Sequence, residues 1–220
     1  MPESPDLRAV AFDLDGLMFN TEDLYQEVGT EILRRRGKLC PVELLDAMMG
    51  RPGRVALQIM IDWHGLSDTI EQLQQETDEV FEGLLDEHLA PMPGLLALLD
   101  RLEQKEVPKA ITTSSRLAFT QRVLGQFDLE PRFNFLLTAA DVTSGKPHPE
   151  IYLTAAERLS ISPANLLVLE DSQHGTRAGV DAGAFVVSVP GGRSRTHDFS
   201  GAAIIADSLE DERIMAALRI

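Results

Sequence analysis

Short apolar runs alternate with amphipathic stretches along most of this chain. In residues 95–102, for example, leucines recur at the spacing of one helix face. Strands that alternate with helices predict a parallel sheet covered by helices on both faces, an α/β fold with a Rossmann-like core. Five runs have the character of buried strands and a sixth that of an edge strand: residues 10–12, 109–112, 135–138, 166–169, 185–189 and 203–205.

One long stretch between the first two runs departs from this alternation. Leu24, Val28 and Ile32 stand at helical spacing, and further helical patterns follow without a convincing strand. A normal connection between parallel strands is far shorter. We therefore expect an α-helical cap subdomain at residues 21–90, inserted into a core formed by residues 1–20 and 91–220.

Composition narrows the class of partner. The 220 residues are 44% hydrophobic and carry a formal net charge of −15, which disfavours nucleic acids and anionic membranes. A small phosphorylated substrate remains possible, because a local cation can outweigh the distant field. The first residues lack a basic start and an apolar stretch, and no run is long enough to cross a bilayer. We expect a cytoplasmic enzyme; the oligomeric state stays open, and a monomer is compatible with the composition.

The segment Phe-Asp-Leu-Asp-Gly at the end of the first run carries the clearest chemistry. Residues two apart in a strand point the same way, so Asp13 and Asp15 are expected side by side, with Gly16 allowing a sharp turn. Such a pair suits a nucleophile or metal ligand beside a proton carrier. A calcium loop is excluded because its twelfth position is Leu24, whereas an ordinary turn remains an alternative.

Hydroxyl groups follow the second run. Thr113, Ser114 and Ser115 come at the carboxyl end of a predicted strand, where ligands collect in open parallel sheets. Hydroxyls and free backbone N–H groups at a helix start make a phosphate seat. Ser115 is also a candidate helix cap, and both interpretations can hold if Thr113 points at the ligand.

A lysine follows the third run. Lys146 stands between Gly145 and Pro147 before a predicted helix. A fixed ammonium there would neutralise phosphate oxygens or an aspartate nucleophile, although a lone lysine in a loop is more often solvated. Its rigid flanks favour the functional interpretation.

Two acids follow the fourth run. Glu170 and Asp171 would be costly at the end of a buried strand unless they meet a cation or hydrogen-bond donors. With Asp13 and Asp15 they form a set of hard oxygen ligands that fits Mg²⁺. Asp171 alone is equally well explained as a helix N-cap.

Taken together, FDLDG, TTSSR, GKPHPE and LEDS resemble, in order and spacing, the motifs of the haloacid dehalogenase-like hydrolase superfamily. The helical insert is similar to the cap of its β-phosphoglucomutase-like and phosphoglycolate phosphatase-like branch. The resemblance implies phosphoryl transfer from a small phosphomonoester in two steps. Asp13 would be the nucleophile, Asp15 the acid and base, and Thr113 and Lys146 the phosphoryl ligands. It further implies Mg²⁺ held by Asp13, the carbonyl of Asp15 and Asp171, with Glu170 ligating or supporting Asp171.

Substrate selection would lie in the cap. The candidate substrate-binding residues are Ser114 in the core, then Asn20, Thr21, Glu22 and Tyr25, and Arg51 and Arg54. Each arginine also has an interpretation as a surface ion pair, which is favoured for Arg54. The mutase branch carries a histidine where this chain has Tyr25, so hydrolysis is expected over mutase activity. The cap pattern is most similar to pseudouridine 5'-phosphatase-like enzymes. The alternatives are a sugar-phosphate mutase and a non-catalytic binding protein.

Overall fold

The structure is a computed structural model that describes residues 6–48 and 53–220, apart from the side chain of Arg193. By its contacts the chain divides into two compact units. The larger unit contains the residues through Asn20 together with Ala90–Ile220, and the smaller unit is Thr21–Leu89. Among the described residues, no helix has the length and apolar character needed to cross a membrane.

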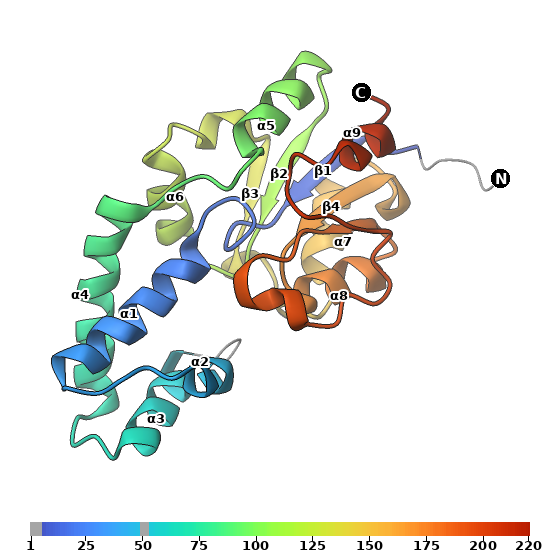
Figure 1. Cartoon of the computed structure of the whole chain (residues 1–220). Coiled ribbons are helices and arrows are strands. Elements are labelled where there is room, and N and C mark those ends of the chain that lie inside the picture. Colours follow the sequence, from blue (N-terminus) through green and yellow to red (C-terminus); the bar gives the residue numbers. More distant parts are fainter. Residues whose placement is uncertain (1–5, 49–52) are drawn as a thin grey trace. The chain divides into compact units, whose positions relative to one another are not determined.

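The larger unit is built on one parallel sheet (Figure 1), which confirms the predicted α/β fold. The strand order is β3-β2-β1-β4-β5-β6, and each neighbouring pair is parallel. The first strand therefore lies at the centre, between β2 and β4. The strands are β1 (Ala9–Phe12), β2 (Lys109–Thr112), β3 (Phe135–Leu137), β4 (Leu166–Glu170), β5 (Phe185–Ser188) and β6 (Ile204–Ile205).

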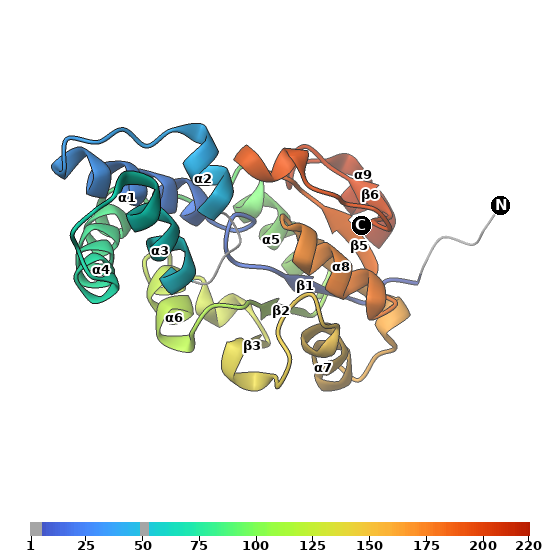
Figure 2. The same ribbon diagram turned by 90° about the horizontal axis from the view of Figure 1, so that it is seen from below.

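Helices cover both faces of this sheet. Ala9 and Ala11 of β1 face the apolar side of α7 and α8, which Figure 2 shows beside the strands. The alternate residues Val10 and Phe12 point the other way and are also fully buried. A central strand buried on both faces explains its continuous apolar run. The helices are α5 (Leu95–Gln104), α6 (Leu117–Gly125), α7 (Glu150–Arg158), α8 (Gln173–Asp181) and α9 (Glu212–Leu218), with short turns η1 (Glu130–Arg132), η2 (Ala139–Asp141), η3 (Pro163–Asn165) and η4 (Gly192–Thr196).

The smaller unit is helical throughout its described residues. It contains α1 (Thr21–Arg35), α2 (Val42–Met48), α3 (Gly53–His64) and α4 (Ile70–His88). Thr69 starts α4 with a capping box, since its side chain accepts from the Gln72 amide and the Gln72 side chain accepts from the Thr69 amide.

The apolar residues at helical spacing are buried on α1 but partly exposed on α3. Leu24, Val28 and Ile32 on α1 are buried. Val55 and Trp63 on α3 are 45% and 48% exposed, because this helix buries its other face through Leu57 and Met60. Helical spacing therefore gives the helix but not the face that packs.

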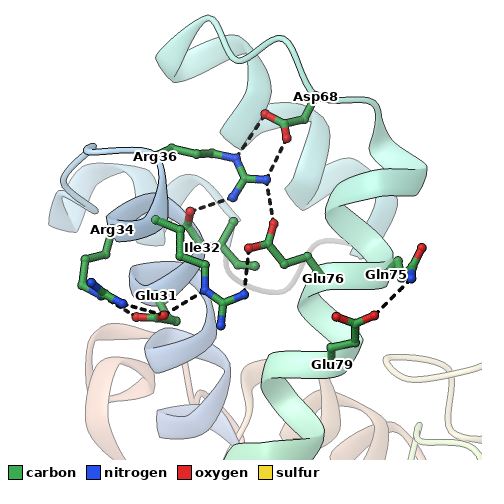
Figure 3. Close-up of polar contacts among 9 residues, drawn as sticks. Glu31, Ile32, Arg34, Arg36, Asp68, Gln75, Glu76 and Glu79 are labelled. Carbon is green, nitrogen blue, oxygen red and sulfur yellow. Dashed lines mark hydrogen bonds and ion pairs between the residues drawn. The ribbon is translucent and has the colours of Figure 1, made fainter.

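An ion-pair network joins α1 to α4 (Figure 3). Arg36 donates to Asp68 at 2.7 Å, to Glu76 at 2.6 Å and to the Ile32 carbonyl at 2.8 Å. The side chains of Arg36, Asp68 and Glu76 are only 19%, 24% and 21% exposed, so solvent screens them weakly. Their hydrogen bonds to Arg36 lower the pKa values of Asp68 and Glu76.

Replacing Arg36 with alanine is expected to lower the free energy of unfolding by about 1–3 kcal/mol, because two partly buried carboxylates lose their shared partner. Carboxyl groups with lowered pKa values stabilise the fold above their unfolded pKa values of about 4, and this stabilisation is lost as the pH falls through their folded values. The difference between wild type and variant in urea unfolding should therefore shrink from pH 7 to pH 3.

Arg34→Ala is the matched control. The Arg34 side chain is 70% exposed and pairs with Glu31 within the same helix. Its removal should leave the unfolding midpoint close to that of the wild type, because an exposed ion pair contributes little to stability. Equal unfolding midpoints for the two variants at pH 7 would contradict a stabilising role for the Arg36 network.

Candidate functional site

The site is built at the carboxyl end of β1. The Asp13 amide donates to the Leu169 carbonyl of β4 at 3.0 Å, so this backbone still belongs to the sheet. Gly16 then takes a positive φ of 75°, and its amide donates to the Phe19 carbonyl at 3.0 Å. The turn expected at Gly16 is present. The Asp13 residue is 7% exposed, whereas Asp15 is half-buried.

The ammonium of Lys146 lies inside the larger unit. Its Nζ is 2.5 Å from Asp13 Oδ1 and 2.6 Å from Glu170 Oε1, and it donates to the Thr112 carbonyl at 2.9 Å. Its side chain is 5% exposed. The interpretation of Lys146 as a solvated loop lysine is therefore wrong, because one buried cation connects the ends of three strands.

Glu170 is completely enclosed by donors. Besides the Lys146 ammonium, its carboxylate accepts from the Tyr152 hydroxyl at 2.8 Å and from the Ser172 amide and hydroxyl at 3.1 and 2.9 Å. The backbone of Gly175 also approaches it closely: a Cβ added there would lie 1.6 Å from Glu170 Oε1. Only glycine leaves room for the carboxylate at this position.

Sequence reasoning missed Tyr152 and Gly175. Tyr152 is fully buried, and its ring also lies 5.2 Å from the Lys146 ammonium. In the sequence it stands within a helical apolar pattern and could be taken for a core residue. The short interval from Lys146 to Tyr152 was the available signal, since Lys146 precedes the helix that carries Tyr152 in its first turn.

Burial and neighbouring charges shift the pKa values of the ionisable groups in this cluster. Burial raises the pKa of Asp13 well above its usual value; Lys146 opposes this, while Glu170 and Asp15 add to it. Burial also acts to raise the pKa of Glu170, but Lys146 and the hydrogen-bond donors outweigh it and lower that pKa. For Lys146, burial favours the neutral amine, but Asp13 and Glu170 outweigh it and hold the pKa well above its usual value. The ionised form of Asp13 is therefore opposed first by burial and then by its acidic neighbours.

The arrangement of acids fits a divalent cation. Asp13, Glu170 and Asp171 are all buried, and each offers a carboxylate oxygen within 4.8 Å of the others. Hard oxygen ligands of this kind suit Mg²⁺, and a cation here would favour the ionised form of Asp13 against its burial and its acidic neighbours. The N-cap of α8 is Ser172, whose side chain accepts from the Gly175 amide at 3.0 Å. The alternative interpretation of Asp171 as this N-cap is therefore wrong.

The hydroxyl-bearing segment after β2 contacts one of the acids that follow β1. Thr113 is fully buried, and its amide donates to the Leu137 carbonyl of β3 at 2.9 Å. Ser114 is exposed. The Ser115 hydroxyl donates to Asp15 Oδ2 at 2.6 Å, and the Thr113 hydroxyl lies 3.4 Å from the same oxygen.

The expected helix cap at Ser115 is wrong. The N-cap of α6 is Arg116, and it makes no side-chain capping bond. The Ser115 hydroxyl instead binds a carboxylate 100 residues earlier in the chain. Sequence reasoning considered Ser115 as part of a phosphate seat and as a cap, so its contact with Asp15 is a finding of the structure.

The predicted substrate-binding residues have several settings. Asn20 lies in the larger unit, and its side-chain oxygen accepts from the Ala90 amide at 2.8 Å. This bond joins the last residue of the first segment of that unit to the first residue of its second segment. In the smaller unit, Thr21 is buried and Glu22 exposed in the first turn of α1.

Tyr25 and Arg54 also have partners within the smaller unit. The Tyr25 ring stacks on that of Phe81 with centroids 4.3 Å apart, and the residue is 46% exposed. Arg54 forms an exposed ion pair with Glu71 at 2.8 Å, as its surface interpretation expected. Arg51 lies outside the described residues.

Several known proteins are similar to this chain in sequence. A family model described as "Haloacid dehalogenase-like hydrolase" matches residues 10–189. "Phosphorylated carbohydrates phosphatase" of Thermotoga maritima is 33% identical over 177 residues, which are 80% of this chain and 82% of that protein. "Probable pseudouridine-5'-phosphatase" of Drosophila melanogaster is 32% identical over 206 residues, covering 91% of this chain and 89% of that protein.

A solved structure extends the similarity over nearly the whole chain. The crystal structure of a "putative beta-phosphoglucomutase" from Thermotoga maritima superposes with a TM-score of 0.80 at 29% identity, covering 97% of each chain. The family model spans all four motifs found in the sequence, from the strand before Asp13 to β5. The two sequence relatives described above carry the names of phosphatases, and the chain belongs to the haloacid dehalogenase-like hydrolase family.

Proposed function

We propose that this protein is a Mg²⁺-dependent phosphatase that hydrolyses a small phosphomonoester through an aspartyl-phosphate intermediate. The observation that carries the proposal is the buried cluster in which Lys146 contacts Asp13 and Glu170 beside Asp171. Such a cluster is costly for a purely structural site. It suits the transfer of a phosphoryl group, whose negative charge must be neutralised from several sides.

Asp13 is the proposed nucleophile. Its Oδ1 is held by the Lys146 ammonium at 2.5 Å, which fixes the carboxylate at the strand end. Attack by the carboxylate on phosphorus would displace the alcohol and leave a phosphoryl group on Asp13, which water then removes. Lys146 and the buried Thr113 would hold the phosphoryl oxygens, with Ser114 at the exposed side of the same turn.

Asp15 is the proposed acid and base. It lies two residues beyond the nucleophile and is half-buried, within reach of the Ser115 hydroxyl. It would give a proton to the departing alcohol and then take one from the attacking water. These two roles need a carboxyl group whose position is fixed while its proton comes and goes.

The cation would be held by Asp13, Asp171 and the Asp15 carbonyl. Glu170 would act mainly by fixing Lys146, because both of its oxygens already accept hydrogen bonds. When bound, Mg²⁺ would act as a Lewis acid and neutralise charge on the phosphoryl oxygens.

The smaller unit is proposed to act as the cap that selects the substrate, with Tyr25, Thr21, Glu22 and the arginines Arg51 and Arg54 as candidates. The names of the relatives support a phosphorylated sugar or nucleoside as the class of substrate. A net charge of −15 supports a small substrate over a nucleic acid.

A sugar-phosphate mutase is the second candidate, favoured by the similarity to the Thermotoga maritima structure. Tyr25 argues against it. A phenol is a poorer proton carrier near neutral pH than the histidine at this position in the mutase branch.

Phosphate release from a panel of phosphomonoesters tests the proposed activity. The panel contains pseudouridine 5'-phosphate, hexose phosphates, glycerol phosphate and phosphoglycolate. We expect Mg²⁺-dependent release that is strongest on one sugar or nucleoside phosphate. Formation of glucose 6-phosphate from β-glucose 1-phosphate, without phosphate release, would replace the phosphatase with the mutase. Neither product from folded protein would contradict both.

The Mg²⁺ dependence of Asp171→Asn tests the proposed cation site. Losing one charged ligand should raise the Mg²⁺ concentration for half-maximal activity by about 10-fold or more, since hard cations are held by charged oxygen ligands. Chelator should abolish wild-type activity. The control is Asp181→Asn, which changes an exposed carboxylate paired with Arg177 in the same unit. An unchanged Mg²⁺ requirement in Asp171→Asn would remove Asp171 from the cation site.

A further inference from the structure

Two hydroxyl groups converge on one oxygen of Asp15. The Ser115 hydroxyl lies 2.6 Å from Asp15 Oδ2, and the Thr113 hydroxyl lies 3.4 Å from it. Of the two, Ser115 makes the much shorter contact. A hydrogen bond to an ionised acceptor is both shorter and stronger than one between neutral groups.

The backbone that carries Ser115 is fixed on both sides. Its amide donates to the Thr113 hydroxyl at 3.0 Å, and its carbonyl accepts from the Ala139 amide at 3.2 Å. The first bond comes from the segment after β2 and the second from the segment after β3. The hydroxyl is therefore presented from a backbone that neighbouring strands hold in place.

The Ser115 hydroxyl does not cap α6, because the N-cap residue of that helix is Arg116. A serine hydroxyl can donate to a carboxylate, and it can accept from a carboxylic acid after a small rotation. This versatility suits a partner that is an acid in one half of a reaction and a base in the other. An amide or ammonium donor would favour the ionised form alone.

We propose that Ser115 is a positioning residue, which orients the Asp15 carboxyl group for proton transfer to the departing alcohol. The proposal rests on the proposed function, in which Asp15 is the acid and base. Ser115 acts through Asp15 and does not bind the phosphoryl group. Its loss should matter most where the leaving group most needs a proton.

The test compares two substrates with Ser115→Ala. Glycerol 2-phosphate has an alkoxide leaving group that needs a proton, whereas 4-nitrophenyl phosphate has a stable phenolate that scarcely does. The value of kcat/KM reports the steps through phosphoryl transfer to the enzyme. We expect kcat/KM to fall about 10-fold or more for glycerol 2-phosphate, but less than about 3-fold for 4-nitrophenyl phosphate, because general acid catalysis contributes roughly 100-fold or more where a proton is needed.

Two further variants make the result specific. Ser115→Thr keeps the hydroxyl and should recover most of the lost activity on glycerol 2-phosphate. Ser162→Ala removes an exposed serine hydroxyl that makes no capping bond before β4, and it should leave both substrates unaffected.

An equal fall in kcat/KM for both substrates would overturn the proposal in favour of direct phosphate binding by Ser115. No fall for either would overturn it as well. Failure of the proposed function itself is distinguishable, because wild-type protein would then release no phosphate from either compound.

Discussion

The buried ammonium of Lys146 is the contact on which the rest of the site depends. Asp13 and Glu170 leave the ends of neighbouring strands β1 and β4 and would repel each other inside the larger unit. Lys146 lies between them, 2.5 and 2.6 Å from their oxygens, and also binds the end of β2. Removing one partner of such a buried pair typically costs about 3–5 kcal/mol, so the fold and the site share this contact.

The environment built around Lys146 is asymmetric. Glu170 receives four hydrogen bonds and has no exposed surface, which keeps it ionised and in place. Asp13 shares the same ammonium but keeps a raised pKa, because burial and neighbouring acids act on it. Glu170 is therefore an ionised, fixed partner of Lys146, whereas burial and the neighbouring acids oppose the ionisation of Asp13. A cation and a phosphoryl group together would complete this arrangement.

The sequence predicts much of the fold because its signals are local. Continuous apolar runs predicted the strands of the sheet to within a few residues, and the helical patterns of the long stretch after the first run predicted helices there. The exposed Val55 and Trp63 show the limit, since helical spacing does not reveal which face finds a partner. Chain order also showed that Asp13, Lys146 and Asp171 follow strands whose ends meet at one edge.

What the sequence could not give depends on contacts between distant residues. Tyr152 has the spacing of a core residue, and only the fold shows its hydroxyl on Glu170. Gly175 has no distinguishing pattern, yet a side chain there would overlap Glu170. Serine and aspartate are both common N-cap residues, but the residue after Ser115 and the residue after Asp171 are the ones at the N-cap positions. Local propensity does not separate these interpretations, because the competing partner lies far along the chain.

Asp13 is the residue proposed to carry the phosphoryl group during turnover. The most direct measurement is rapid acid quenching of the enzyme with a radiolabelled phosphomonoester that it hydrolyses, followed by peptide mapping. We expect a hydroxylamine-sensitive phosphoryl group on the peptide containing Asp13, and none on folded Asp13→Asn, whose turnover should fall by about 1000-fold or more. Label on another residue, or undiminished turnover by Asp13→Asn, would rule out Asp13 as the nucleophile.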